Sequence, residues 1–564
     1  MNRQRSFIGS IVAGAIAVLV IAIAGFYWFF PKSQVNSIAP TSQPGATIFV
    51  SKLAPVMVSL LANPDSLQAL EREGELSKLK TSFLAKTTID YQQDIKPWLG
   101  NEITLAVTTL DIDRDPENGQ QSGYLLALAT KQPEKSREFV ELLFSKRALA
   151  GANLNVEEYK GVKLISDNQE AIAENKIQIP QSKIQNNLAG AVVGEGFVLF
   201  ANDPKVLREA INNVQAPDLN LTSSPEYQKA TKELAKGSIA VAFLNLPMVA
   251  KWQGLELPEQ TYNSEIISLL LNPKGLLAET AFITSSEMVS PSPPLTKPVG
   301  ALQYVPASAG LAISGSNLSN LGNSDVAQLW KQTTATIYGS QEDVVSRFLK
   351  PLGDTQKRWG INLPEDIFSW VQGEYAIALL PEEQTTPHWI FVAEKSGGVE
   401  QGVGRLDAIA LSNGLTISPL TIDNQKIYAW TELTTATKKT NTKEGGSFSI
   451  ETKVRGAHTT LGNYEIFTSD LETMDEILTT KGNSLINNPN FQDSMTAIPR
   501  PNQGYIYLDW TKSQNLLERQ IPILKLAEVL GKPFFNNLRS LTVSSYGTNT
   551  GALKGGVFFH LKNS

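Results

Sequence analysis

The most strongly apolar segment of the chain lies at its N-terminus. Phe7 to Phe30 is a run of 24 residues without a charge, built from aliphatic and aromatic residues with a single serine. A helix of this length spans the roughly 30 Å hydrocarbon core of a bilayer. Arg3 and Arg5 precede the run and aromatic residues end it, a pattern typical of a helix whose N-terminus stays in the cytoplasm. We therefore predict that residues 1–30 form a cytoplasmic stub and a single-pass transmembrane anchor.

The residues after the apolar run indicate whether it is retained. A cleaved signal peptide has a shorter apolar core and a cleavage site made of small residues, whereas bulky aromatic residues and Pro31 stand here. An uncleaved anchor is therefore favoured over a signal peptide. Residues 31–43 are rich in Ser, Pro, Gln and Asn, a composition that disfavours packing and predicts a short spacer.

The rest of the chain contains an internal repeat. Four landmarks recur in the same order, and the two copies of each lie 262 to 272 residues apart. Four ordered matches at such similar offsets indicate a duplicated unit. The first landmark predicts a turn that enters a strand. The landmarks begin at Pro44 and Pro306, at Asp94 and Asp366, at Gly196 and Asn463, and at Pro225 and Pro489.

The repeat sets the predicted domain boundaries. We predict a first α+β copy over residues 44–288 and a second copy over residues 299–564. Residues 289–298 contain four prolines in ten positions, which predicts a linker. Residues 170–187 are a polar insert of the first copy. Residues 434–456, polar and rich in Thr and Lys, predict an exposed hairpin extension of the second copy.

Two of the landmarks predict local structure in detail. Trp98-Leu-Gly-Asn-Glu predicts the end of a short helix, with Gly100 as a turn residue free to adopt positive φ before an alternating strand; Gly373 takes this place in the second copy. Asp203-Pro204 predicts a helix start, because the carboxylate caps free amides and proline needs no N–H in the first turn. The whole pattern predicts an α+β fold, a mostly antiparallel sheet with helices on one face.

These segments resemble a known family. The anchor, the Asp-Ile-x-x-Trp-x-Gly segment at Asp94 and the Ala-Asn-Asp-Pro segment at Ala201 are similar to the membrane-anchored, largely cyanobacterial proteins of unknown function grouped as DUF3352. The resemblance covers nearly the whole body. It implies a protein of the thylakoid or cytoplasmic membrane with its body in the lumen or periplasm. The family supplies no catalytic residues to carry over.

Composition excludes several classes of function. The chain has 49 basic and 55 acidic residues, a formal charge of −6, without long runs of either sign, so we expect no nucleic-acid partner. It contains no cysteine, which excludes disulfides and thiolate chemistry. Its three histidines, His388, His458 and His560, are far apart in the sequence. We therefore predict no metal site and no cofactor.

One acidic segment has the composition of a calcium loop. Asp111, Asp113, Asp115 and Glu117 occupy alternate positions. An EF-hand would need glycine where Pro116 stands and glutamate further on, and the segment fails both requirements. We expect a solvated hairpin tip, because these residue types favour turns.

A second segment approximates a dinucleotide loop. Gly402-Val-Gly404-Arg-Leu-Asp407 follows an apolar run, but Asp407 stands where the third glycine belongs and no β-α-β pattern surrounds it. A plain turn before a helix is favoured. Neither a phosphate loop nor a serine elbow occurs in the chain.

The remaining titratable groups give no catalytic assignment. His560 lies in a C-terminal strand, where a packed or surface histidine is favoured over a general base. Adjacent carboxylates such as Glu157 and Glu158, Glu382 and Glu383, and Asp475 and Glu476 point apart on a strand or helix and are expected on the solvated surface. The catalytic residues, if any, stay unknown.

One apolar helix is a candidate binding element. Apolar residues recur from Leu516 to Leu530, and Ile266 to Leu271 is expected to hold the same place in the first copy. Such a helix fits contact with lipid or with a membrane protein. Packing of the helix onto the sheet of its own domain is favoured, because amphipathic helices of soluble domains show the same pattern.

The sequence leaves three classes of function open. We expect a non-enzymatic, membrane-tethered binding or assembly protein that engages a protein or lipid-like partner near the membrane. An extracytoplasmic hydrolase, whose carboxylates converge only in the folded chain, is the first alternative. A purely architectural envelope protein is the second.

Overall fold

The described part of the chain forms two compact units. A computed structural model describes residues 43–61, 91–115, 117, 120–168, 187–254, 261–284, 294–319, 328–329, 362–381, 387–438, 447–479, 482–520, 532–549 and 551–562. Of these, 43–271 and 278–284 belong to the first unit, and 272–277 together with those from 294 onward belong to the second.

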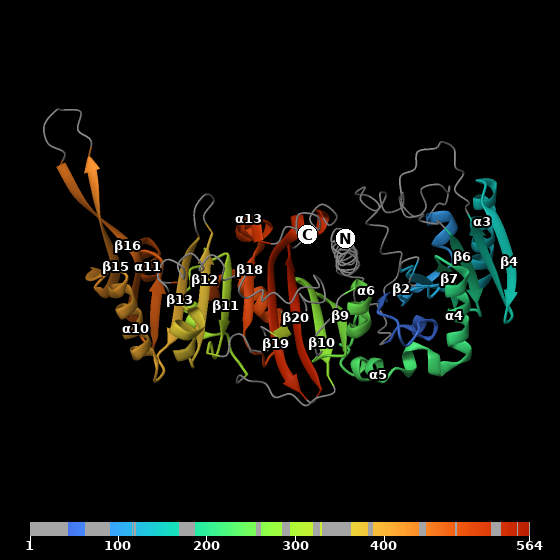
Figure 1. Cartoon of the computed structure of the whole chain (residues 1–564), viewed down its shortest axis with the longest axis horizontal. Helices are drawn as coiled ribbons and strands as arrows, with labels where there is room; N and C mark the ends of the chain where they lie inside the picture. The colour runs from blue at the N-terminus through green and yellow to red at the C-terminus, as the bar shows by residue number, and fades with distance from the viewer. Residues whose placement is uncertain are drawn as a thin grey trace. The chain divides into compact units, whose positions relative to one another are not determined.

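The first unit is built from strands, α-helices and short 3₁₀ or π turns labelled η (Figure 1). In chain order they are η2 (Gly45–Phe49), β1 (Val56–Leu60), η4 (Tyr91–Ile95), β2 (Leu99–Thr109), β3 (Gly123–Thr130), α3 (Pro133–Leu149), β4 (Asn153–Tyr159), β5 (Val162–Asn168), β6 (Leu188–Val193), β7 (Phe197–Ala201), α4 (Pro204–Gln215), η5 (Pro217–Leu219), η6 (Leu221–Ser223), α5 (Pro225–Thr231), β8 (Ala240–Asn245), α6 (Leu246–Gln253), β9 (Ser264–Asn272) and β10 (Gly275–Ile283).

The second unit has elements of the same kinds. In chain order they are η7 (Gly300–Tyr304), β11 (Leu311–Gly315), η9 (Leu363–Ile367), η10 (Phe368–Trp370), β12 (Tyr375–Leu380), β13 (His388–Glu394), α10 (Val399–Ser412), β14 (Thr416–Ile422), β15 (Gln425–Lys438), β16 (Ser447–Leu461), β17 (Tyr464–Thr468), α11 (Leu471–Thr479), η11 (Leu485–Asn487), α12 (Pro489–Ala497), β18 (Tyr505–Asp509), α13 (Trp510–Gln520), α15 (Lys532–Asn537), β19 (Leu538–Asn549) and β20 (Ala552–Leu561).

The strands pair in the same order in both units. In the first the order is β9-β8-β1-β2-β3-β7-β6-β5-β4, with β10 beside β9. In the second it is β20-β19-β18-β11-β12-β13-β17-β16-β15-β14. Each neighbouring pair in these two orders is antiparallel, which confirms the predicted α+β class with a mostly antiparallel sheet.

Helices cover both faces of the sheet in the first unit. Buried α4 residues such as Leu207 pack with Leu199 of β7. Buried α3 residues such as Phe139 pack with Val198, the neighbour of Leu199. Because successive strand residues point to opposite faces, α3 and α4 lie on opposite faces. The predicted placement of helices on one face is therefore wrong; strands such as β7 are apolar on both faces and need cover on both.

The same contacts recur in the two units. The Trp98 indole donates a 2.7 Å hydrogen bond from Nε1 to the Asp94 carbonyl, and Trp370 donates to the Asp366 carbonyl at the same distance. The Glu102 carboxylate accepts from the Gly45 amide at 2.8 Å. In the second unit, Glu374 accepts from the Gly300 amide at 2.6 Å.

These contacts correct the first sequence landmark. The counterpart of Gly45 is Gly300, and both residues begin a 3₁₀ helix that is capped by a carboxylate. The predicted turn into a strand at Pro44 is wrong, because the strand of this segment begins only at Val56. The match of Pro44 with Pro306 is therefore out of register.

The two landmark glycines also differ from their predicted role. Gly100 lies inside β2 and is not among the residues with positive φ. A Cβ there would come within 3.0 Å of the Ala129 carbonyl oxygen, and one on Gly373 would come within 2.8 Å of the Glu394 carboxylate. Close approach of the neighbouring strand, not a turn, explains why glycine stands at position 100. Gly373 lies in a bend before β12, and its near neighbour is the Glu394 side chain.

Two helix predictions have different outcomes. Asp203 accepts from the Lys205 amide at 2.7 Å and Pro204 begins α4, which confirms that helix start. Ile266 to Leu271, expected to match the apolar helix after Leu516, is wrong because these residues belong to strand β9. The counterpart of β9 in the second unit is β19. Most of the apolar run from Leu516 to Leu530 lies outside the described residues.

The polar segment of the second unit forms a two-stranded ribbon. β15 and β16 pair as far as Lys438 and Ser447 and extend away from the other strands of that unit (Figure 1), which confirms the predicted hairpin extension. Where the ribbon begins, Trp430 faces Gly456 and Thr431 faces Val454, so Arg455 is an extra residue in β16. Such a bulge bends a strand and increases its twist.

The predicted anchor, spacer and first polar insert lie outside the described residues, apart from Gln43 and Asn187. Within the described part of the chain, helices that combine the length and the apolar character needed to cross a bilayer are absent.

Candidate functional site

All three histidines of the chain lie in the second unit, and each contacts a carboxylate. Histidine and carboxylate side chains are the groups that most often move protons in proteins. These pairs are therefore the first places to look for chemistry. They are His388 with Asp470, His458 with Glu465 and Asp407, and His560 with Asp493.

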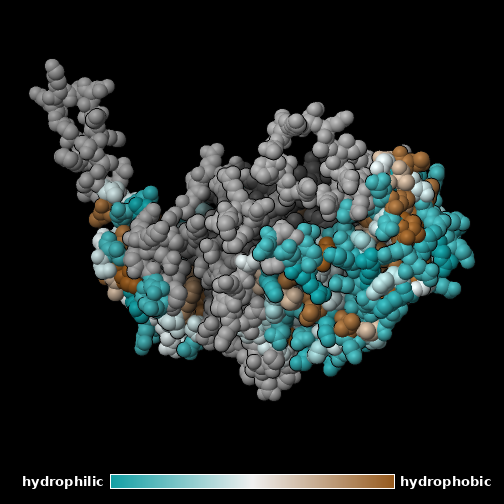
Figure 2. All heavy atoms as spheres, turned by 45° about the vertical axis from the view of Figure 1, so that its right-hand side comes forward, coloured by the Kyte–Doolittle hydropathy of each residue, from teal (hydrophilic) through white to brown (hydrophobic). Residues whose placement is uncertain are grey.

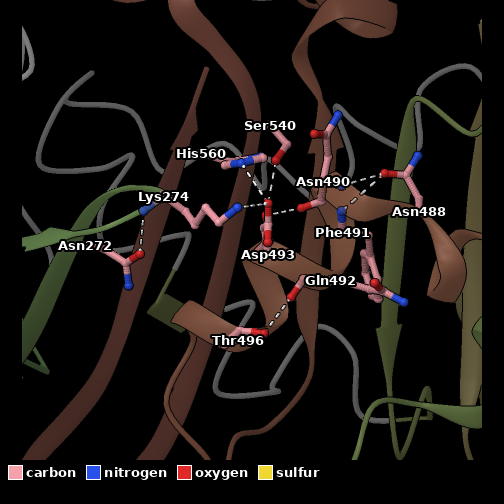
Figure 3. Close-up of polar contacts among 11 residues, drawn as sticks. Asn272, Lys274, Asn488, Asn490, Phe491, Gln492, Asp493, Thr496, Ser540 and His560 are labelled. Atoms are coloured by element: carbon pink, nitrogen blue, oxygen red, sulfur yellow. Dashed lines mark hydrogen bonds and ion pairs between the residues drawn. The ribbon is translucent and has the colours of Figure 1, made fainter. Parts of the chain in front are cut away.

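Asp493 lies between Lys274 and His560 (Figure 3). Its Oδ2 atom is 3.3 Å from Lys274 Nζ and 3.4 Å from His560 Nε2. α12 supplies Asp493, β20 supplies His560, and Lys274 follows β9 in the turn that belongs to this unit. The Leu561 amide donates to the Lys274 carbonyl at 3.0 Å, which fixes the backbone of that turn beside β20.

The His560 ring is buried and favours its neutral form. It is 5% exposed and stacks on Phe558. Burial lowers its pKa below the usual 6.5, Lys274 and Arg539 lower it further, and Asp493 offsets part of the effect. Its Nδ1 atom has no hydrogen-bond partner within the described segments.

The serines beside this histidine bond to other groups. Ser540 faces His560 across β19 and β20, but its hydroxyl lies 3.1 Å from the Ser494 hydroxyl. Ser494 donates to the Asn490 carbonyl at 2.9 Å. A serine nucleophile must donate its hydroxyl proton to the histidine, so these hydrogen bonds of Ser540 and Ser494 do not form a Ser-His-Asp relay. The cluster can hold a proton and bind the turn at Lys274 to α12.

The first unit lacks this cluster. α5 corresponds to α12, since Pro225 and Pro489 begin the two helices after matching caps. Lys229 and Ala230 then stand where α12 has Asp493 and Ser494. The shared fold does not require the carboxylate, so the Asp493 cluster is specific to the second unit.

His458 lies between two carboxylates under α10. Its Nδ1 atom is 3.0 Å from Glu465 Oε1, and its Nε2 atom is 3.3 Å from Asp407 Oδ1. Trp430 Nε1 donates to the same Asp407 oxygen at 2.7 Å, and Thr460 donates to Glu465 at 2.6 Å. The group links a partly exposed carboxylate on α10 to a buried one on β17.

Aromatic rings enclose this histidine. Tyr428 and Phe467 stack on it with centroids 5.3 Å and 5.7 Å away, and Trp430 lies beside it at 5.4 Å. His458 is 4% exposed. The rings exclude water from the imidazole, so His458 and its partners form part of the packed core and not an open surface.

His388 pairs with the carboxylate that caps α11. Asp470 accepts from the Thr473 amide at 2.8 Å and contacts His388 Nδ1. Burial alone would raise the pKa of Asp470, but hydrogen bonds from Ser469, Thr473 and His388 outweigh it and hold the pKa below its usual value. Ser469 and Asp470 both approach Nδ1, whereas a catalytic relay uses the two ring nitrogens separately.

The sequence-predicted acidic and glycine segments have structural roles. Asp111 and Asp113 lie in the predicted hairpin tip between β2 and β3. Their carboxylates accept hydrogen bonds from backbone amides of the same loop. Among the described residues, no group of three or more His, Asp or Glu side chains is arranged so that it could hold a metal ion. Gly402 and Gly404 lie inside α10, so the expected turn before a helix is wrong; Gly402 lets the helix approach Trp370.

Most partners of the histidines could not be found from the sequence. Asp493 and Asp470 are distant from their histidines in the chain and carry no motif. His458 and Glu465 are closer, because both flank the β16 to β17 turn. Alternating positions of that hairpin give a weak signal that His458 and Glu465 share a face.

Comparison with known proteins identifies the family of this chain. The model of the family described as "Protein of unknown function (DUF3352)" matches residues 11–561. The chain belongs to the DUF3352 family. The membership fits the repeated landmarks, which run through the body of this DUF3352 protein. Curated proteins give no match.

Solved structures similar to this DUF3352 protein include crystal forms of TP0453. Form IV is 11% identical with a TM-score of 0.24, covering 43% of this chain and 80% of its own. Form I is 9% identical with the same TM-score, covering 44% and 82%. Likeness at this level carries no functional argument.

Proposed function

We propose that the protein is a membrane-tethered, extracytoplasmic binding or assembly protein that engages a protein or lipid-like partner near the membrane. The predicted anchor at Phe7 to Phe30 supports tethering, with the N-terminus in the cytoplasm and the body in the periplasm or lumen. The predicted spacer of residues 31–43 reaches at most about 45 Å when extended. A body so tethered works close to the bilayer.

We infer that the body is a tandem duplication. The proposed copies are residues 44–288 and residues 299–564, joined by the proline-rich segment 289–298. The identical strand order and the matched tryptophan and glutamate contacts support this inference. Two copies of one scaffold allow one to keep a structural role while the other changes its surface.

The observation that carries the binding proposal is the outer edge of the first unit. Among the described strands, β4 pairs only with β5, so one edge of its backbone has no strand partner. Leu154 and Val156 are 39% and 56% exposed on this strand, and Leu149 at the end of α3 is 90% exposed. Figure 2, which brings this end forward, shows apolar side chains among hydrophilic ones.

The second unit closes the equivalent edge. Val156 faces Ile165, which faces Gly190, which faces Phe200. The matching series in the second unit runs from Pro419 through Tyr428 and His458 to Phe467. Pro419 is thus the counterpart of Val156. Proline blocks strand addition because it has no N–H to donate, so β14 is protected where β4 is open.

An open edge with alternate apolar side chains suits an extended partner segment. Such a segment would gain backbone hydrogen bonds from β4 and would cover Leu154 and Val156. Glu158 lies on the same face of the strand and would favour a basic residue in the partner. Lipid acyl chains could cover the apolar side chains but could not form hydrogen bonds with the free N–H and C=O groups of the β4 backbone.

A photo-cross-linker tests the edge directly. We would place benzoylphenylalanine at Leu154 in the full-length chain in its native membranes and, as a matched control, at Ile417, the corresponding position of β14. We expect a discrete adduct from position 154 only, and mass spectrometry separates protein from lipid adducts. Val156→Pro, the residue that the second unit already accommodates, should abolish the adduct.

Two results would refute the edge as the binding surface: equal labelling from positions 154 and 417, or an adduct that survives Val156→Pro in a chain with unchanged circular dichroism.

The predicted membrane topology needs a separate test. Because the chain has no cysteine, single cysteines at Asn2 and Gln43 report their side with an impermeant maleimide. We expect labelling of intact cells or right-side-out vesicles at position 43 only.

A further inference from the structure

Glu265 is a buried carboxylate in an apolar row of the first sheet. The row crosses the sheet through Val107, Val56 and Leu244, each of which faces the next, and reaches Glu265 on β9. Glu265 is 2% exposed and Leu244 is fully buried. An ionised carboxylate at such a position loses its hydration without replacement.

One neutral hydrogen bond stabilises this carboxylate. The Thr280 hydroxyl of β10 donates to Glu265 Oε1 at 2.8 Å. Burial raises the pKa of Glu265 to about 7, and the Thr280 bond offsets part of that increase. Burial and this bond are the causes of the shift, so no described charge compensates the carboxylate.

The elements around Glu265 contain few charged residues. β1 and β8 have none, and β9 has only Glu265 itself. Glu279 of β10 is adjacent to Thr280 and therefore points to the opposite face. Lys251 is the one charged residue of α6, and it is exposed. None of these supplies a counterion to Glu265.

The second unit has leucine at this position. Leu311 faces Leu508, which faces Leu541, in the registers that correspond to Val56, Leu244 and Glu265. Leu541 in turn faces Phe559, so the second row stays apolar. The shared scaffold is therefore built without a carboxyl group here, and Glu265 is a departure specific to the first unit.

We propose that Glu265 is a proton-binding site that makes the packing of the β9 to β10 region respond to pH. The protonated carboxyl is neutral and fits the apolar row. Its ionisation places an uncompensated charge between β8 and β10, which favours opening of this part of the sheet. The proposal is independent of the proposed binding function, because it concerns a buried residue on β9 and not the edge strand β4.

Hydrogen exchange in the full-length chain tests this site. The opening that exposes Glu265 should become about tenfold more favourable between pH 6 and pH 8, the difference expected for a carboxyl that shifts from near 4.5 when exposed to near 7 when buried. We expect the protection of amides in residues 264–283, corrected for intrinsic exchange, to fall by that factor in the wild-type protein.

Matched variants make the result decisive. Glu265→Gln keeps the shape, and Glu265→Leu introduces the counterpart residue; both should leave corrected protection equal at pH 6 and pH 8. Glu279→Gln removes a charge from the opposite face and should keep the wild-type response. The proposal is overturned if wild-type protection is independent of pH, or if Glu265→Gln keeps the tenfold change. Should Glu265→Leu misfold, the glutamine variant decides alone.

Discussion

Gly402 of α10 lies directly against the Trp370 indole, so closely that an added Cβ would come 2.3 Å from ring atom Cδ2. The contact lets α10 approach the face of the sheet that also contains Phe391 and Phe467. Gly404, two residues further along the helix, has open space at the same position.

This difference predicts opposite effects of one substitution in one helix. Gly402→Ala should lower the free energy of unfolding by about 1–3 kcal/mol, because the Trp370 ring must shift within a packed core. Gly404→Ala should raise it by up to about 1 kcal/mol through helix propensity. Urea unfolding of both variants checks this; equal effects would show that the ring moves freely.

Opening the protected edge should promote association. Pro419→Val would give β14 the backbone donor that its counterpart β4 has, and we expect concentration-dependent self-association in sedimentation velocity. Pro419→Gly restores the N–H without a branched apolar side chain and should associate less. A Pro419→Val variant that stays monomeric at all concentrations would argue that other features protect this edge.

His560 should make stability sensitive to acid. Because its pKa is lowered in the folded protein, the unfolded chain binds the proton more tightly, and stability falls as the pH decreases through about 6.5. His560→Asn should reduce the difference between unfolding free energies at pH 7.5 and pH 5. Asp493→Asn removes the group that raises this pKa and should increase the difference.

Buried and exposed ion pairs should contribute differently. Asp167 contacts Arg147 and accepts from the Leu188 amide at 2.7 Å, and its side chain is fully buried. Asp167→Asn should cost about 3 kcal/mol, because removing the buried carboxylate charge breaks its ion pair with Arg147. Glu157→Gln breaks a partly exposed pair with Arg208 and should cost less than about 1 kcal/mol. Thermal unfolding of the two variants compares them.

Features that depend on contacts within a few residues of the chain can be predicted from the sequence. The start of α4 at Asp203 and Pro204 follows from capping within a few residues, so the sequence was sufficient. The four recurring landmarks are recognisable in the sequence because both units contain matching tryptophan, carboxylate-cap and strand contacts. The sequence predicts the wrong element for Ile266 to Leu271, because a six-residue apolar run suits a buried strand and a helix equally.

Nonlocal contacts could not be predicted. Glycine at position 100 depends on the Ala129 backbone of another strand, and Asp493 becomes noteworthy only when β20 brings His560 beside it. Glu265 cannot be distinguished from the other glutamates until the strand registers of the two units identify Leu541 as its counterpart. These features require the pairing of strands.

The bulge at Arg455 has a consequence for the ribbon of β15 and β16. One additional residue reverses which side of a strand every later side chain occupies, since alternation has a period of two. If Arg455 instead paired with Thr431 in a regular ladder, Val454, Lys453 and Thr452 would each move to the opposite face of the ribbon from the one that the bulge gives them. The orientation of a whole projecting surface is thus encoded by a single insertion.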